Sequence, residues 1–221
     1  MMKNNVPTSS HRGLTAAVRQ VALGAALAGS VLSLGGCFPL AAGGALMTGI
    51  VASDRRSSGT QLEDKNIELK AAFQIRQSIG ERAHINVNSY NRQVLISGEV
   101  PSAQDKSLAE KLVKEVDGVN TVLNELAVMG NTSFSERSSD LVTNGRVTAA
   151  IFDAKDLTTN AFKIVTERGV VYVMGRVTAR EAKRVTEVVT AVSGVKKMVR
   201  VLDIISEDEL ARIAPPPAPQ K

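Results

Sequence analysis

Residues 85–100, INVNSYNRQVLISGEV, decide the fold, because a similar stretch, FKIVTERGVVYVMGRV, returns 77 positions later at residues 162–177. Each stretch holds two short apolar runs on either side of a turn, Asn91-Arg92 in the first copy and Arg168-Gly169 in the second. Apolar runs joined by such a turn predict a β-hairpin. The chain is therefore built on an internal repeat with one hairpin in each copy.

Apolar residues at helical spacing lie on both sides of each hairpin. After the first hairpin the pattern follows Ser102, which can cap a helix, and after the second it follows Thr178. A short apolar run then ends each copy. The pattern predicts two α+β units, each ordered helix–strand–strand–helix–strand, with a three-stranded mixed sheet covered by two helices. The residues expected to face inward include Ile67, Ala71, Ile75, Ile79, Leu108, Leu112 and Val116 in the first copy, and Val147, Ile151, Ala182, Val185, Val189 and Val192 in the second.

Four glycines are interpreted as structural. Gly98 and Gly175 stand alone in the return strands of the hairpins, where glycine indicates a bulge or a close approach of backbone. Gly118 and Gly194 follow the second helix of each copy and are expected to end it. Because no glycine-rich loop leads into a helix with a following Lys-Ser or Lys-Thr, nucleotide binding is not supported.

The first 36 residues have the pattern of a secretory signal. The first carboxylate of the chain is Asp54, and an uncharged apolar run over residues 21–34 follows a basic lead. The run ends in Leu34-Gly35-Gly36-Cys37, which resembles the lipobox of bacterial lipoproteins, where the cysteine becomes the lipidated first residue. The sequence thus predicts a signal peptide over residues 1–36 and lipidation of Cys37. The alternative is an ordinary signal peptide or an uncleaved anchor, in which Cys37 has no role in processing.

Lipidation would place the protein on a membrane facing the periplasm, since several acyl chains hold a protein there almost permanently. Phe38, rather than an aspartate, follows the cysteine and favours the outer membrane. Asp208 and Glu209 lie near a proline-rich end and are expected to be solvated. The expected parts are a flexible lipidated tether at residues 37–61, a first unit at 62–130, a second unit at 136–206 and a disordered tail at 207–221.

Composition argues against an enzyme and against nucleic-acid binding. The single cysteine and two histidines, His11 and His84, exclude a cysteine–histidine zinc site, and no other metal or cofactor is expected. His84 is expected to be an exposed strand residue. Five phenylalanines, two tyrosines and no tryptophan provide few stacking platforms for single-stranded nucleic acid.

The repeated hairpin, the glycine in its return strand and the helix that follows, behind Cys37, resemble the dual BON-domain lipoproteins, in particular the division- and outer membrane stress-associated lipid-binding protein family. The likeness covers residues 37–205 and includes DRRSSGTQ at 54–61 and VTAREA at 177–182. Members of that family bind anionic phospholipid, support outer-membrane integrity and have no catalytic activity, so the resemblance implies the same here.

The two copies carry opposite net charges. Residues 62–129 hold 8 Lys and Arg against 10 Asp and Glu, whereas residues 139–205 hold 11 against 7. Each suitably placed cation attracts a surface of anionic lipid by about 1 kcal/mol, and salt weakens the attraction. The second unit is therefore expected to bind anionic phospholipid, unless both units merely carry solvated charged surfaces.

The first helix of the second unit is the expected contact. Leu141 and Val142 have no place in its inward stripe, and Gly145 and Arg146 follow one turn later, where the arginine can meet a phosphate. The family tends to carry an aromatic residue near this site, and none is evident here. Packing of Leu141 and Val142 against the first unit is an equally open alternative.

The return strand of the second hairpin is apolar on both faces. Val170, Tyr172 and Met174 point away from the two helices, so this face must be covered as well. The first unit is the simplest cover. A partner protein is the alternative, which gives a competing hypothesis: an adaptor for envelope assembly or peptidoglycan remodelling, with lipid contact only through the anchor.

Overall fold

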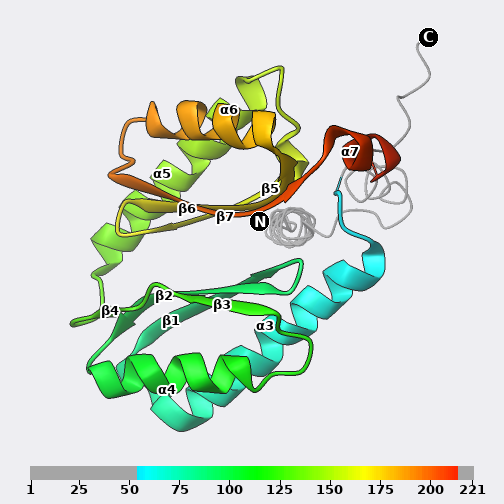
Figure 1. The fold of residues 1–221 in the computed structure, drawn as a ribbon. Helices are drawn as coiled ribbons and strands as arrows, with labels where there is room; N and C mark the ends of the chain where they lie inside the picture. Colours follow the sequence, from blue (N-terminus) through cyan, green and yellow to red (C-terminus); the bar gives the residue numbers. More distant parts are fainter. Residues whose placement is uncertain (1–53, 214–221) are drawn as a thin grey trace, which may run out of the picture. The chain divides into compact units, whose positions relative to one another are not determined.

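The structure is a computed structural model and describes residues 54–213. The signal peptide, Cys37 and the tether up to residue 53 lie outside the described residues, as do residues 214–221 of the tail. The first unit contains α3 (Ser58–Ile79), η1 (Gly80–Arg82), β1 (His84–Tyr90), β2 (Gln93–Val100), α4 (Ala103–Lys114), β3 (Thr121–Asn124) and β4 (Ala127–Val128) (Figure 1). The second unit contains α5 (Phe134–Asp153), η2 (Thr159–Ala161), β5 (Phe162–Glu167), β6 (Val170–Thr178), α6 (Ala179–Thr190) and β7 (Lys197–Ile205), and α7 (Glu207–Ile213) follows.

Both units confirm the predicted order of elements. In the first, β1 pairs antiparallel with β2, and β3 and β4 both pair parallel with β2, as two pieces of one broken strand. In the second, β5 pairs antiparallel with β6, and β7 runs parallel to β6 over its whole length. The hairpin turns also lie where expected. Asn91 and Arg92 have φ of 50° and 64°, and a two-residue hairpin turn of this hand requires positive φ at both positions.

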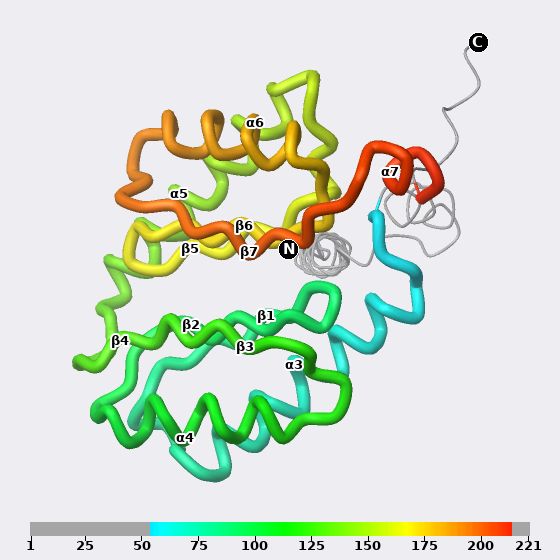
Figure 2. The backbone as a smooth tube through the Cα atoms, viewed as in Figure 1, coloured from blue at the N-terminus to red at the C-terminus, as the bar shows by residue number. Residues whose placement is uncertain are grey.

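Two helices cover one face of each sheet: α3 and α4 in the first unit, α5 and α6 in the second (Figure 2). Ser102 and Thr178 cap α4 and α6 as predicted, each accepting a hydrogen bond from a backbone amide of the first turn. The buried residues of the two cores include Ile67, Ala71, Ile75 and Ile79 from α3 and Val147, Ile151, Val185 and Val189 from α5 and α6, as the periodicity predicted.

The other faces of the two sheets share a third cluster. Tyr90 and Leu95 of the first unit pack with Tyr172 and Met174 of the second, and all four are buried. The prediction that the first unit covers the apolar face of the return strand is confirmed. Because that face is occupied within the chain, it does not offer the docking surface that the adaptor hypothesis required.

The tether was expected to extend to residue 61, but its last residues belong to helix α3. Ser57 accepts a hydrogen bond from the amide of Thr60, so α3 begins at Ser58 rather than beyond residue 61. Immediately before it, Arg55 is buried against the second unit and Arg56 donates to Asp54. Arg55 thus joins this segment to a partner 126 positions away, whereas Arg56 pairs locally with Asp54 and Asp64.

The expected tail also begins too early. Residues 207–213 form helix α7, and Glu209 is held by an ion pair with Arg176 of β6. The expectation that Glu209 is solvated is therefore wrong, whereas Asp208 is exposed as expected. No sequence pattern predicts this pairing, because the two partners lie in different elements.

The structure confirms the close approach of backbone that was predicted at Gly98. It does not confirm the prediction that Gly118 ends a helix. Gly98 has φ of 114°, and a Cβ there would lie 2.1 Å from the carbonyl oxygen of His84. At Gly175 a Cβ would lie 2.5 Å from the carbonyl oxygen of Ala161. Neither Gly118 nor Gly194 caps a helix, because α4 already ends at Lys114 and α6 at Thr190. Both glycines lie in the turns that follow, with positive φ.

Candidate functional site

Helix α5 presents large apolar side chains to solvent. Ser133 and Glu136 form a capping box, which starts the helix at Phe134 and so sets which residues face inward. The sequence assigned the start of the second unit to residue 136 and therefore missed this aromatic residue. The exposed fractions are 86% for Phe134, 74% for Leu141, 53% for Val142 and 66% for Phe152, and we call these four residues the α5 stripe.

The members of the α5 stripe share one side of the helix. With 3.6 residues per turn, Phe134, Leu141 and Phe152 lie within about 20° of one another around the axis, and Val142 flanks them. The opposite side is buried through Val147 and its neighbours. Leu141 and Val142 remain mostly exposed rather than packed against the first unit, although Leu141 lines a cleft together with His84 and Asn86 of that unit.

Cations border the stripe. Arg146 is exposed and forms no ion pair with any carboxylate of the described residues. The ammonium group of Lys155 lies 5.7 Å from the centre of the Phe152 ring, at the end of the helix. Gly145 leaves the middle of the stripe open, since no atom of the described chain outside the helix backbone lies within 4 Å of a Cβ placed there. The helix thus combines an exposed apolar side with an unpaired cation, as interfacial helices do.

A comparable stripe on α3 was not expected from the sequence. Leu62, Leu69 and Phe73 are exposed by 65%, 61% and 61%, and their spacing places them on one side of the helix. We call them the α3 stripe. It belongs to the unit whose net charge is negative, which distinguishes it from the α5 stripe.

One buried aspartate in each unit fixes the adjacent hairpin turn. Asp64 of α3 accepts hydrogen bonds from the backbone amides of Asn91 and Arg92, both at 2.8 Å. Asp140 of α5 accepts in the same way from the amides of Arg168 and Gly169, at 2.7 and 2.8 Å. The sequence reasoning missed both residues, although they lie 76 positions apart and so follow the repeat.

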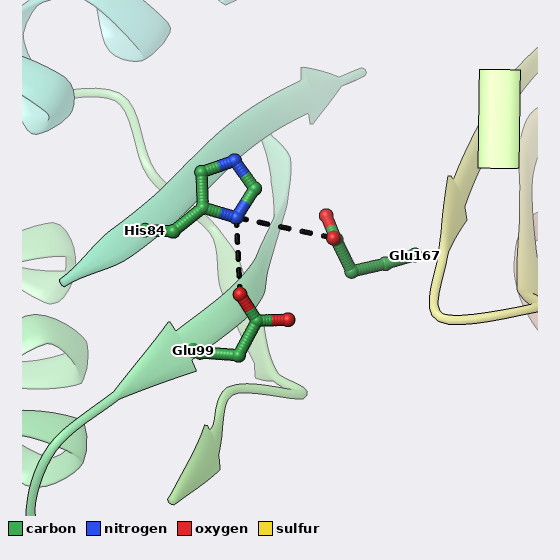
Figure 3. A group of neighbouring side chains, drawn as sticks. All are labelled: His84, Glu99 and Glu167. Atoms are coloured by element: carbon green, nitrogen blue, oxygen red, sulfur yellow. Dashed lines mark hydrogen bonds and ion pairs between the residues drawn. The ribbon is translucent and has the colours of Figure 1, made fainter. Parts of the chain in front are cut away.

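Three titratable side chains from both units converge near one end of the sheets (Figure 3). His84 Nδ1 lies 3.2 Å from Glu99 Oε2 and 3.9 Å from Glu167 Oε1. His84 is partly buried and bonded rather than exposed, which corrects the expectation from the strand pattern. Burial raises the pKa of Glu167 above its ordinary value, and the neighbouring Glu99 raises it further, against the hydrogen bond from Asn86.

Within the described residues, no helix has both the length and the apolar character needed to cross a membrane.

Comparisons with known proteins agree with this architecture. The family model of the BON domain matches residues 64–130 and 139–205. The outer membrane lipoprotein DolP of Haemophilus influenzae is 34% identical over 179 residues, which cover 80% of this chain and 93% of that protein. A 21 kDa hemolysin of Actinobacillus pleuropneumoniae is 27% identical over 154 residues, covering 69% of this chain and 79% of the relative.

Among solved structures, the C-terminal domain of CdsD, a structural protein of the type III secretion system of Chlamydia trachomatis, is 10% identical. The match covers 68% of this chain and all of that one with a TM-score of 0.28, too low to bear on fold or function. The family model covers both repeats, and the 34% identical relative is matched over nearly its whole length. The chain therefore belongs to the BON-domain family, as a tandem-BON outer-membrane lipoprotein.

Proposed function

We propose that this lipoprotein is non-catalytic and that its second unit binds anionic phospholipid through helix α5, in support of outer-membrane integrity. The α5 stripe is the observation that supports the proposal most, because a soluble surface seldom exposes several large apolar side chains in one row. The residues of the contact are Leu141, Val142, Gly145 and Arg146, as the sequence suggested, joined by Phe134.

The anchor makes weak surface binding sufficient. Lipidation of Cys37 would hold the chain at the periplasmic face of the outer membrane, so the second unit would meet headgroups at high effective concentration. Each apolar side chain of the stripe contributes at most about 1.5–3 kcal/mol if it leaves water completely, and each cation about 1 kcal/mol. Shallow burial together with Arg146 is enough to orient a tethered unit.

Vesicle flotation of residues 38–221, produced without the lipid, tests the contact. We expect this chain to float with vesicles that contain phosphatidylglycerol and to remain in solution with vesicles of phosphatidylcholine alone. Added salt should weaken the binding, because the cationic share of the attraction is screened. Leu141→Asp with Val142→Asp should abolish it, since both substitutions place a carboxylate against anionic headgroups.

The α3 stripe provides a matched control. Leu69→Asp with Phe73→Asp removes a similar amount of exposed apolar surface from the first unit and should leave flotation unchanged. Retained folding, measured by circular dichroism, is required of both pairs of substitutions. Loss of binding in the α3 variant alone, or equal binding to both kinds of vesicle, would contradict the proposal.

A further inference from the structure

His84, Glu99 and Glu167 form a group in which two buried carboxylates share one imidazole. Glu99 is completely buried and Glu167 is 7% exposed, yet neither carboxylate forms an ion pair with a lysine or arginine of the described chain. Their shared partner is one imidazole, which carries at most a single positive charge. Buried charges are normally paired or bound to a metal ion, so at least one negative charge here lacks its counterpart.

One oxygen of this group also lacks a hydrogen bond. Glu99 Oε2 accepts from the amide and the hydroxyl of Thr132, at 3.2 and 3.0 Å, and lies next to His84. Glu99 Oε1 is buried and has no hydrogen-bond partner among residues 54–213. A buried carboxylate oxygen without a donor is costly, and this one belongs to a side chain that points at the other two (Figure 3).

We propose that His84, Glu99 and Glu167 bind a divalent first-row transition-metal ion of the Zn²⁺ class, which joins the two BON units. One imidazole nitrogen and two carboxylate oxygens are ligands that such ions take. The three potential ligand atoms lie within 4.8 Å of one another. Around tetrahedral zinc, neighbouring ligand atoms are about 3.3–3.6 Å apart, so the observed 3.2 and 3.9 Å need only small adjustments.

The surroundings suit a bound ion. Asn86 donates to Glu167 Oε2 at 2.9 Å and so holds this ligand from behind. A cleft of about 210 Å³ that is lined by His84 and Glu167 provides a path from solvent. Arg137 also lines the cleft, but its guanidinium donates to the carbonyl of Thr132 and leaves both carboxylates to the ion.

The ligands come from β1 and β2 of the first unit and β5 of the second, so the ion would hold the units together. Isothermal titration calorimetry with Zn²⁺ tests this. The protein is the full chain with His11→Ala and Cys37→Ala and without a histidine tag, which leaves His84 as the sole histidine and no thiol. We expect one Zn²⁺ per chain, a rise in melting temperature that EDTA reverses, and a much weaker response to Mg²⁺.

His84→Ala and Glu167→Gln should each lower the Zn²⁺ affinity about tenfold or more, in line with the loss of a metal ligand or its support. Glu207→Gln, at an exposed ion pair, is the matched control and should bind like the parent. Circular dichroism establishes that each variant folds. If His84→Ala does not fold, Glu167→Gln alone tests the site. No saturable binding, or binding that survives both ligand substitutions, would overturn the proposal.

Discussion

Arg55 and Glu181 form a buried ion pair although 126 positions separate them in the chain. Arg55 Nη1 and Nη2 donate to the two carboxylate oxygens at 2.8 and 2.7 Å, and the side chains are only 5% and 4% exposed. Nη1 also donates to the carbonyl oxygen of Arg176 at 3.0 Å. The residues that precede the first unit are thus fixed to the second.

Arg55→Ala should destabilise the protein strongly, because it leaves the carboxylate of Glu181 buried without its cation. Removing one partner of a buried pair costs about 3–5 kcal/mol. Urea unfolding followed by circular dichroism measures the change. Arg180→Ala is the control: its 3.5 Å pair with Glu207 is about 60% exposed on both sides, so the loss should stay below about 1 kcal/mol. Equal losses in the two variants would contradict the role of burial.

The ion pair between Arg55 and Glu181 should also make the free energy of unfolding depend on pH. Burial alone would raise the pKa of Glu181, but the hydrogen bonds from Arg55 and from the amide of Thr178 lower it below the ordinary value. A lowered pKa in the folded state contributes stability above the ordinary carboxyl pKa, and the contribution is lost as the pH falls through the folded pKa. We expect the free energy of unfolding to fall below about pH 5, with a smaller slope in Arg55→Ala.

Glu167 should act in the opposite direction when divalent cations are absent. Its pKa is raised by burial, so the folded state holds the proton more tightly than the unfolded chain. The stabilising contribution is then present below the ordinary pKa and is lost as the pH rises through the raised value. Glu167→Gln in EDTA is therefore expected to raise the melting temperature at neutral pH and to flatten this decline. A lower melting temperature in the variant would show that the carboxylate stabilises the apo fold.

Two glycines should respond oppositely to alanine. Gly98→Ala forces a Cβ to within 2.1 Å of a carbonyl oxygen at φ of 114° and should cost at least about 2 kcal/mol. Gly145→Ala lies inside α5 with nothing within 4 Å, so higher helix propensity should stabilise the protein by about 0.5–1 kcal/mol. Thermal unfolding of both variants decides this. A stabilising alanine at position 98 would refute the close approach.

Asp140 should be essential for the second hairpin turn. Asp140→Ala removes the acceptor of two backbone amides, and hydrogen bonds to a charged group contribute about 1.5–3 kcal/mol each. Asp140→Asn retains one acceptor oxygen and should lose less. Amide hydrogen exchange at Arg168 and Gly169 gives the local readout, since both amides should exchange faster in the alanine variant. Unchanged protection there would contradict the assignment.

Most of the fold was predictable because each unit repeats a local pattern. The spacing of Ile67, Ala71 and Ile75 marks one face of a helix whatever packs against it, and the turn at Asn91-Arg92 is a local signal. The candidate lipid contact was predictable in part. Leu141 and Val142 stood out as apolar residues outside the inward stripe, whereas Phe134 was missed because the start of its helix depends on the cap at Ser133.

The sequence alone determined the two-unit architecture, the inward faces and the charge difference between the copies, since all of these follow from the order and spacing of residues. Only the tertiary structure decided which distant polar groups meet. Arg55 reaches Glu181, and His84 reaches Glu167, because the two sheets pack through Tyr90 and Tyr172. Packing between the two sheets brings these polar residues together, but it imposes no periodic pattern on their positions in the sequence. Their pairing therefore cannot be predicted before the units are docked.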